Sequence, residues 1–566
     1  MSQLTRTVAA VEFTIVYSNR ARRWLIALLL AHVAYAVAFI WRSSFVVQGE
    51  RFFCLFDDAM ISMRYARNLA HGHGLVWNPT GERVEGFTNP LWTLIMAGWH
   101  LIPWPMSKAS LPIQITSECC LLANLLILAR IARQRLSEGF ALLSVACAAF
   151  YYPLNNWALQ GMEVGLLALL FSAGVWSTWQ CERSRLSPWI ALLPSAVAML
   201  VRPDAAVAHL VFAFYLLWRN PEKRPVIVAA AFVWLLVCVG GQTLFRWVYY
   251  GDLAPNTYYL KMTGFPVFWR MTRGTLHAAW FWAKFLWPFA ALALWHWVTV
   301  SRRTGPAGEG TREESLRRIS ADTLAPSLLL LGLVGAQTLY SCYVGGDAWE
   351  RIAGANRFIA PVVPFAFILA FGTLEHLGGV QRLFSRGRSL GLIAYGFAGL
   401  VNPNMFFGPS SLAYLVLLEP PLYKADNERN VRLALALREF TQPHATVAVD
   451  YAGAPAYFAD RQMIDLLGKA DRHVARLPAH RNVLGVSRFL EYYPGHLKWD
   501  YKYSIGELQP DVVCAIWRRT LGDSHRHLHG TYLQGEIAGF SVYLKKGSPA
   551  IRWDQIPFTP TEVAAP

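Results

Sequence analysis

The sequence predicts a polytopic α-helical membrane protein with about eleven transmembrane helices and a C-terminal extracytoplasmic α/β domain. Hydrophobic residues make up 54% of the 566 residues and charged residues only 16%, well under the roughly 25% charged residues of soluble domains. Long apolar runs recur as far as about residue 423, after which the chain becomes more polar. We therefore predict a transmembrane domain over residues 1–423 and a soluble domain over residues 424–566.

Short basic clusters between the apolar runs predict the orientation. Arg20, Arg22 and Arg23 precede the first run, residues 24–41, which we interpret as a retained anchor with a cytoplasmic N-terminus. Further cytoplasmic turns are predicted at residues 181–185, 219–224, 301–318 and 381–389. The odd number of spans then places the C-terminal domain on the outer face.

The first outer loop is predicted to cover residues 42–110. Within it, residues 59–72 have the amphipathic spacing of a helix that stops at a glycine. Residues 89–103 are apolar but too few to cross a bilayer as a helix. We expect this segment to be a half-inserted helix on the outer face. The next apolar run, residues 111–131, ends among arginines and returns the chain to the cytoplasm.

Charge and cysteine content exclude several classes of partner. The net charge is +16, but the basic residues lie in short clusters between apolar runs, a pattern typical of topology signals and not of nucleic-acid binding. The eight cysteines lack metal-ligand spacing, and Cys119 and Cys120 lie inside an apolar run. His71 and His73 are more typical of an exposed turn than of a metal site. We predict no cofactor, and no motif supports a divalent metal.

The unusual polar residues collect in the predicted outer turns. A charge at the edge of a bilayer is costly unless it has a partner or lines a cavity, so these residues are candidates for function. Acids beside bases at the ends of different helices predict a water-accessible cavity suited to an anionic head group and a hydroxyl that must lose its proton. The candidates are Asp57, Asp58, Glu163, Arg202, Asp204, Asp252, Lys261, Asp347, Glu350 and Arg357.

Several of these residues also have a purely structural interpretation. Asp58 could cap a helix that begins at Ala59, although a cap needs only one of the two adjacent acids. Arg202 and Asp204 could form an ion pair at a helix break, and Lys261 could extend to the lipid head groups. These alternatives stay open at the level of the sequence.

The soluble domain shows a mixed pattern. Residues 430–440 have helical spacing, while residues 445–453, 511–517 and 540–546 are typical of strands. Asp465 follows another apolar strand-like run, and Gly468 closes a turn. We favour a strand end here over a direct role in binding an acceptor glycan.

Several ordered blocks resemble the GT-C superfamily of membrane glycosyltransferases, and within it the mycobacterial terminal β-(1→2)-arabinofuranosyltransferase family. They are the outer-loop acid pair DD, RYARNLAHGHGLVWNPTGERVEGFTNPLW, LQGMEVGL, VRPDA, YYGDLAPNTYYLK, VGGDAWERIAGANRFIAPVVP and GHLKWDYKYSIGELQPDVV. One block differs, because family members have GGDFMHGR where this chain has GGDAWERIAGANR. The difference removes a histidine and displaces the arginine that is Arg357 here.

The resemblance implies an inverting transferase that takes a sugar from a polyprenyl-phosphate donor. Asp57 or Asp58 would be the base, and Arg202, Lys261 and Arg357 would bind the donor phosphate. Glu163, Asp204 and Asp347 would complete the site for the donor phosphate and sugar. The sugar would be arabinofuranose or another pentose or hexose, and the acceptor a cell-envelope glycan or lipid-glycan.

The resemblance also implies a place in the cell. The protein would lie in the bacterial inner membrane, with the site and the C-terminal domain periplasmic or extracellular and with no nucleic acid partner. A transporter or flippase for a lipid-linked sugar, or a glycan-binding membrane protein without catalysis, are the alternatives. A transporter would favour charges in the middle of spans and repeated halves, whereas here the charges gather at helix ends and no repeat is seen.

Overall fold

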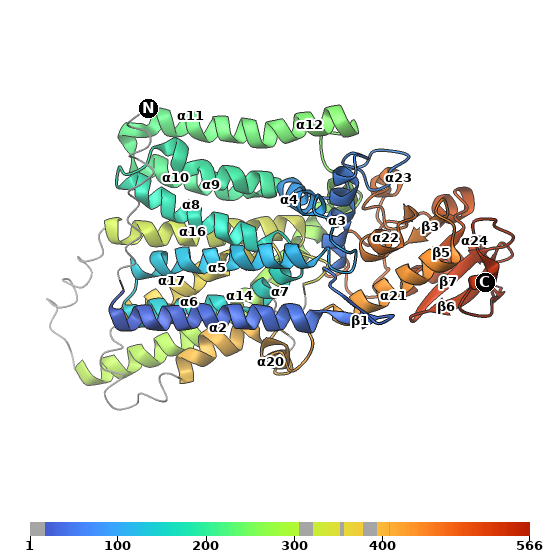
Figure 1. Ribbon diagram of the computed structural model, residues 1–566. Coiled ribbons are helices and arrows are strands. Elements are labelled where there is room, and N and C mark those ends of the chain that lie inside the picture. The colour runs from blue at the N-terminus through green and yellow to red at the C-terminus, as the bar shows by residue number, and fades with distance from the viewer. Residues whose placement is uncertain (1–16, 305–320, 351–355, 377–392, 407, 566) are drawn as a thin grey trace.

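The protein is an elongated bundle of helices with a sheet-containing region at one end (Figure 1). The computed structural model describes residues 17–304, 321–350, 356–376, 393–406 and 408–565. The principal helices of the bundle are α2 (Asn19–Ser43), α5 (Leu111–Arg133), α6 (Glu138–Ala149), α7 (Tyr152–Leu159), α8 (Val164–Glu182), α9 (Pro188–Val201), α10 (Ala206–Arg219), α11 (Arg224–Leu235), α12 (Gly241–Tyr250), α13 (Asn256–Met262), α14 (Val267–Thr304), α16 (Ala321–Val344), α17 (Val363–His376) and α20 (Ser411–Leu415).

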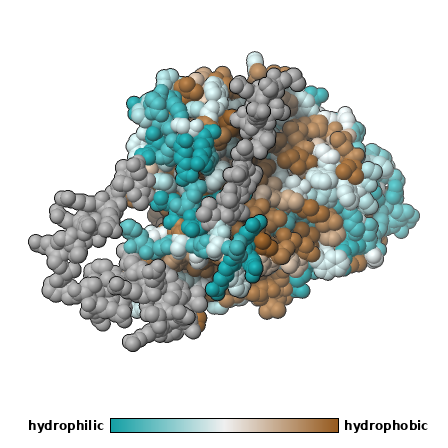
Figure 2. Space-filling view, turned by 60° about the vertical axis from the view of Figure 1, so that its left-hand side comes forward, coloured by the Kyte–Doolittle hydropathy of each residue, from teal (hydrophilic) through white to brown (hydrophobic). Residues whose placement is uncertain are grey.

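The bundle has the apolar character of a membrane domain. Among the described residues, five helical segments are long and apolar enough to cross a bilayer. They are Asn19–Ser43, Leu111–Arg133, Val164–Glu182, Pro221–Tyr250 and Leu324–Val344, and shorter apolar helices are Glu138–Ala149, Pro188–Val201 and Ala360–His376. Large apolar side chains such as Phe232 and Trp247 are more than half exposed, and apolar surface forms broad patches between more hydrophilic areas (Figure 2). The count of about eleven spans stays a prediction.

The predicted cytoplasmic turns lie together at one end of the bundle. Arg183 donates a hydrogen bond to Gln134, and Arg219 pairs with Glu182, so the ends of α5, α8 and α10 are neighbours. The predicted turn at residues 381–389, and most of that at 301–318, lie outside the described residues. At the opposite end of the bundle are the first outer loop and the C-terminal region (Figure 1).

The first outer loop is well ordered. Its β1 (Phe45–Val47) and β2 (Glu50–Phe52) form a hairpin whose turn residues, Gln48 and Gly49, both have positive φ, as a two-residue hairpin turn requires. The helix expected at residues 59–72 is α3 (Asp57–Ala70), which lies across the end of the bundle. The predicted half-inserted segment forms the short helix α4 (Pro90–His100).

The C-terminal region contains a six-stranded mixed sheet in the order β4–β3–β5–β7–β6–β8. The predicted helix and strands appear as α21, β3, β5 and β7, and the run before Asp465 is β4. The sequence did not predict β6 and β8. The bounds are α21 (Lys424–Phe440), β3 (Thr446–Val449), α22 (Ala454–Ala459), β4 (Gln462–Asp465), α23 (Arg472–Arg476), β5 (Val512–Cys514), α24 (Leu521–Leu528), β6 (Tyr532–Ile537), β7 (Phe540–Lys545) and β8 (Thr561–Glu562).

Strand direction divides this sheet into two parts. Strand β3 pairs in parallel with both β4 and β5, whereas β5, β7, β6 and β8 pair antiparallel in turn. The carboxyl ends of the three parallel strands therefore lie at one edge of the sheet. Loops leave all three strands at this edge, which is where open α/β sheets usually bind ligands.

Candidate active site

A small cavity of about 70 Å³ lies where α3, α8, α13 and the segment after α16 meet. We call it the membrane-side cavity. It brings together five of the predicted site residues, from parts of the chain up to 299 positions apart. Its polar lining is Asp58, Ser62, Thr88, Asn89, Glu163, Arg202, Thr257, Lys261, Arg357 and Lys469.

Asp58 is the acid of the adjacent pair that faces this cavity. Its Oδ2 accepts a 2.9 Å hydrogen bond from Nη1 of Arg357, and its Oδ1 lies 3.5 Å from Nζ of Lys469. Burial alone would raise the pKa of Asp58, but Lys469 and Arg357 outweigh it and hold that pKa below its usual value. Among the described residues, the Lys469 ammonium is the partner of Oδ1. Asp58 therefore presents an ionised carboxylate whose Oδ1, held at 3.5 Å from Lys469, can also accept a ligand hydroxyl.

Arg357 is held between two carboxylates. Its Nε and Nη2 bond the two oxygens of Asp347 at 2.6 and 2.7 Å, and Nη1 bonds Asp58. Its guanidinium also lies over the ring of Trp157, with 5.4 Å from Cζ to the ring centroid. Because its main donor positions already have partners, Arg357 fixes Asp58 in place and is poorly placed to bind a ligand phosphate in a bidentate manner.

A second buried ion-pair group forms the opposite wall. Arg202 ends α9 in an extended conformation, and bonds Glu163 and Asp204 at 2.9 Å each. Glu163 also accepts a hydrogen bond from Asn89. Arg202 is thus both the ion-paired helix break considered from the sequence and a lining residue of the cavity. Asp204 pairs with Arg202 outside the lining, as Asp347 pairs with Arg357.

Lys261, on α13, is the cation with the fewest partners in this cavity. Its side chain lines the cavity together with Asp58 and Arg357. Burial, with help from Arg357, lowers the pKa of Lys261 to about 8. Among the described residues, none forms a hydrogen bond or ion pair with Nζ. An anionic ligand would restore the favourable electrostatics of this buried ammonium.

Asp57 points away from the membrane-side cavity and joins α3 to the C-terminal region. Its Oδ1 and Oδ2 accept hydrogen bonds from the amides of Ala454 and Gly453, at the N-terminus of α22. The structural alternative in which Asp58 caps a helix beginning at Ala59 is contradicted, because α3 begins at Asp57 and lacks a side-chain cap. The capping acid is Asp57, and the helix that it caps belongs to the C-terminal region.

The same face of α3 binds the other end of α22. Arg64 donates to the carbonyl of Ala456, and Arg67 donates to the carbonyl of Tyr457 at 2.8 Å. An acidic side chain at the N-terminus of α22 and basic side chains near its C-terminus both interact favourably with the helix dipole. The spacing of Asp57, Arg64 and Arg67 puts the three on one face of a helix, and this spacing is the sequence signal that separates Asp57 from Asp58.

The close packing of α22 on α3 predicts a large effect at Gly453. A Cβ at this position would lie 1.8 Å from the carbonyl oxygen of Asp57. Gly453→Ala is therefore expected to destabilise the protein by about 1–3 kcal/mol or more, as overpacking does. Gly522→Ala, where a Cβ meets nothing within 4 Å, is the control and should leave the melting temperature unchanged or raised. Equal melting temperatures for the two variants in detergent would contradict the packing.

Lys469 is the functional candidate that the sequence reasoning missed. It lies in the turn after β4, is 6% exposed, and reaches the membrane-side cavity from the C-terminal region. Burial would lower the pKa of Lys469, but Asp58, Asp57 and Asp465 outweigh it and raise that pKa. The sequence feature that could have indicated Lys469 is its position directly after Gly468, in a turn that follows a buried strand. Asp465 itself accepts three backbone amides of this turn and shapes it.

The other predicted charges lie outside the membrane-side cavity. Asp252 pairs with Arg472 and Arg476 and holds α23. Glu350 pairs with Arg273 of α14 at 2.8 Å. Among the described residues no group of three or more His, Cys, Asp or Glu side chains is placed to hold a metal ion.

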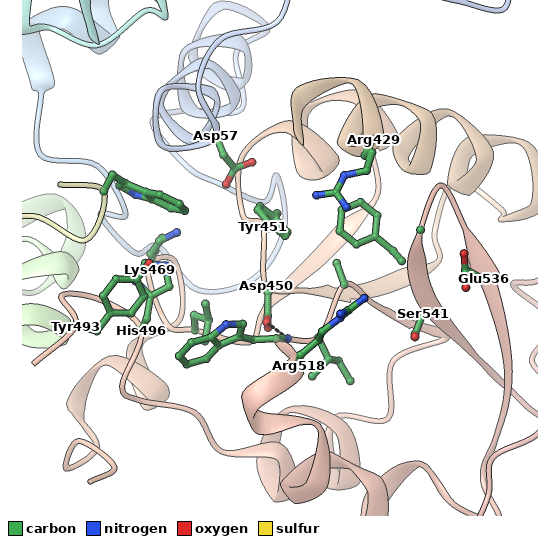
Figure 3. A pocket seen from close by; sticks show the side chains of 17 residues that line it. Asp57, Arg429, Asp450, Tyr451, Lys469, Tyr493, His496, Arg518, Glu536 and Ser541 are labelled. Carbon is green, nitrogen blue, oxygen red and sulfur yellow. Dashed lines mark hydrogen bonds between the residues drawn. The ribbon is translucent and has the colours of Figure 1, made fainter. Parts of the chain in front are cut away.

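A larger cavity, of about 600 Å³, lies next to the first and is formed mainly by the C-terminal region. We call it the domain cavity. Asp57 from α3 contributes to its wall, as do Asp450, Tyr493, His496 and Glu536 (Figure 3). Lys469 lines both cavities. The two cavities are therefore separated by the Lys469 side chain and the first turn of α3.

Comparisons with known proteins agree with this architecture. Residues 421–543 match a family model described as a domain of unknown function, DUF8728. The terminal β-(1→2)-arabinofuranosyltransferase of Mycobacterium tuberculosis (strain ATCC 25618 / H37Rv) is 30% identical over 249 residues, which are 41% of this chain and 38% of the relative. The enzyme of the same name from Corynebacterium glutamicum is 25% identical over 319 residues, 51% of this chain and 44% of the relative. The matches thus span less than half the length of these relatives.

The fold has a neighbour among solved structures. The crystal structure of ArnT from Cupriavidus metallidurans bound to undecaprenyl phosphate superposes with a TM-score of 0.53 at 12% identity, covering 92% of this chain and 98% of ArnT. At this identity the likeness concerns the fold alone. By sequence and by fold, the chain resembles the GT-C membrane glycosyltransferases, and the terminal β-(1→2)-arabinofuranosyltransferases among them, as its ordered sequence blocks predicted.

Proposed function

We propose that the protein is an inverting glycosyltransferase that moves a sugar, arabinofuranose in the first instance, from a polyprenyl-phosphate donor to a hydroxyl of a cell-envelope glycan. The observation that carries this proposal is the membrane-side cavity, where the ionised carboxylate of Asp58 lies beside the cations of Arg357, Lys261 and Lys469. One carboxylate and several cations are the groups that transfer from a phosphate leaving group requires.

The proposed step uses residues of this chain alone. The acceptor hydroxyl gives its proton to Oδ1 of Asp58 while its oxygen attacks the anomeric carbon of the donor. The bond from that carbon to the phosphate oxygen breaks, and the polyprenyl phosphate leaves with the electron pair. Because attack is direct and from the face opposite the phosphate, the anomeric configuration inverts.

The cations have different tasks in this scheme. Lys261 receives the phosphate, because Arg357 and Arg202 are occupied by carboxylates. Arg357 positions Asp58, and Glu163 with Asn89 supports Arg202 at the cavity wall. Lys469 lies beside Asp58 and keeps it ionised until the acceptor enters.

The relatives and the neighbouring fold support the choice of substrates. The curated relatives are named for arabinofuranosyl transfer, and the ArnT structure contains undecaprenyl phosphate. We place the protein in the bacterial inner membrane with about eleven spans, a cytoplasmic N-terminus, and the site and C-terminal region on the outer face.

The direct test is transfer by the purified protein. Wild-type protein in lipid nanodiscs is supplied with polyprenyl-phosphate arabinofuranose and a soluble arabinofuranose oligosaccharide, and the product is analysed by mass spectrometry and by NMR of its new anomeric centre. We expect one added pentose with inverted configuration. Movement of labelled donor across vesicles without any new glycosidic bond would instead support a flippase and overturn the proposal. A matched polyprenyl-phosphate hexose donor tests the choice of sugar.

Lys469 provides a pH-dependent prediction for the same reaction. Since Lys469 lowers the pKa of Asp58, Lys469→Met should raise it, so more Asp58 is protonated at acidic pH. The acidic limb of the kcat/KM profile, which reports the free enzyme, should move to higher pH. Lys469→Arg keeps the positive charge, so its acidic limb should lie at the same pH as that of wild type. An unchanged limb in Lys469→Met would contradict the coupling.

A further inference from the structure

The domain cavity has the location of a ligand site. Asp450 directly follows β3, Leu467 and Lys469 follow β4, and Ala515 to Trp517 follow β5, so the cavity lies at the carboxyl ends of the three parallel strands. Open α/β sheets bind ligands at this edge. Its volume of about 600 Å³ is within the range of roughly 300–1,000 Å³ of small-molecule sites.

Asp450 supplies a buried polar group that lacks a partner. One carboxyl oxygen, Oδ2, accepts the backbone N–H of Trp517. The other, Oδ1, has no hydrogen-bond partner among the described residues, although the residue is 5% exposed and lines the cavity. Burial raises the pKa of Asp450 to about 8. An unsatisfied buried polar group is costly, and a ligand hydroxyl that accepts from or donates to Oδ1 would remove that cost.

One wall of the domain cavity is aromatic. The rings of Tyr493 and His496 are 4.5 Å apart, and those of Tyr493 and Trp517 are 6.1 Å apart in a nearly parallel arrangement. Trp349 adds an edge contact to His496 at 5.7 Å. The negative faces of aromatic rings attract weakly positive C–H groups, which a sugar ring presents on its faces.

The lining of the domain cavity contains both acidic and basic side chains, and the carboxyl of Asp450 is largely neutral near pH 7 because burial raises its pKa to about 8. Carboxyl groups of Asp57, Asp450 and Glu536 stand against the cations of Arg429, Lys469 and Arg518 (Figure 3). Asp57 is engaged with α22, and Arg429 pairs with Asp426. The acidic side chains would repel a polyanionic ligand, and the basic side chains would repel a polycationic one. A neutral ligand rich in hydroxyls can instead form hydrogen bonds with both kinds of side chain.

We propose that the domain cavity binds a neutral oligosaccharide, the chain that precedes the acceptor hydroxyl, with Asp450 bonding one of its hydroxyls and Trp517 and Tyr493 packing on a ring. The proposal deepens the proposed function and rests on it. Since Lys469 lines both cavities and separates them, its side chain has to move aside for the terminal residue of such a chain to reach Asp58. The chain region matched by the domain of unknown function would thus select the acceptor.

The test measures binding without any donor, which separates it from catalysis. The full-length protein in detergent is titrated with a neutral arabinofuranose oligosaccharide, neutral glucose and mannose oligosaccharides, and an oligogalacturonate, with tryptophan fluorescence and equilibrium dialysis as readouts. We expect saturable binding of a neutral oligosaccharide by wild type. Asp450→Ala should weaken it by about tenfold or more, the effect of losing a buried hydrogen-bond partner. As a second variant, Trp517→Leu removes an aromatic face and should also weaken binding.

The control is Asp554→Asn, an exposed acid of the same region that lies outside the cavity lining, which should bind as wild type does. In transfer assays the two cavity variants should raise the acceptor KM more than they lower kcat. Equal binding by Asp450→Ala, Trp517→Leu and wild type, or preference for oligogalacturonate, would overturn the inference. If wild type transfers sugar but binds no neutral oligosaccharide, the inference fails and the proposed function stands. If no transfer occurs although binding is seen, the proposed function fails instead.

Discussion

Asp58→Asn is expected to lower sugar transfer by about 10²–10⁴-fold, the contribution of a positioned general base. Asparagine has nearly the same shape and can still accept the hydrogen bond from Arg357 through its amide oxygen, so the cavity should keep its structure. It cannot take up the acceptor proton. The loss should therefore appear in kcat, with donor binding close to that of wild type, while the melting temperature falls because Arg357 and Lys469 lose the charge of Asp58.

Asp57→Asn is the matched control for this prediction, because the two acids are adjacent in the chain and the same conservative replacement is made at each. Asp57 accepts two backbone amides of α22 and does not line the membrane-side cavity. Its amide variant should retain activity within about tenfold, since the cap is weakened by only about 1 kcal/mol. The measurement is the initial rate of sugar transfer by each of the two variants at saturating donor. A pattern in which Asp57→Asn is inactive and Asp58→Asn is active would reverse the assignment and reject Asp58 as the base.

Arg357→Met is the second prediction with a large expected effect. Arg357 and Asp347 are both buried, with side chains 8% and 3% exposed, and the same guanidinium bonds Asp58. Removing one partner of a buried pair leaves an uncompensated charge and typically costs about 3–5 kcal/mol. We expect a lower melting temperature, and a loss of activity because Asp58 is no longer held.

Two further variants separate the stability effect from the catalytic one. Arg357→Met combined with Asp347→Asn removes the orphaned charge and should recover part of the stability but not the activity. Arg432→Met breaks an exposed ion pair with Glu428 on α21 and should change stability by no more than about 1 kcal/mol. If Arg357→Met melts as wild type does, the buried network is not the stabilising element that its geometry indicates.

The sequence predicted where the polar residues of the site gather, but not their pairing. Span parity and charge clusters were enough to assign Asp58, Glu163, Arg202, Lys261 and Arg357 to one end of the bundle, because both follow from local hydropathy. The pairing of Arg357 with Asp347 and Asp58 depends on how helices distant in the chain pack. Nothing in the spacing of a single sequence encodes that packing.

The roles of Asp57 and Lys469 illustrate the same division. Helical spacing puts Asp57 on the face of Arg64 and Arg67, but only the tertiary fold decides that this face meets α22 while Asp58 faces the membrane-side cavity. Lys469 enters the site from a soluble domain more than 400 residues after Asp58 in the chain, so only the tertiary fold brings it there. Strands β6 and β8 were missed since Gly535 and the short run Thr561–Glu562 lack a clear alternating pattern.

The hydrogen bonds between α3 and α22 limit how domains can be exchanged between related proteins. Asp57, Arg64 and Arg67 satisfy backbone groups of α22, so the C-terminal region is completed by a helix encoded 390–397 residues upstream of its partners. A hybrid that exchanges only residues 424–566 between relatives would separate these partners. The segment that has to be exchanged is therefore discontinuous and consists of α3 together with the C-terminal region. A substitution in α3 that alters these contacts should be compensated by a substitution in α22, and the reverse.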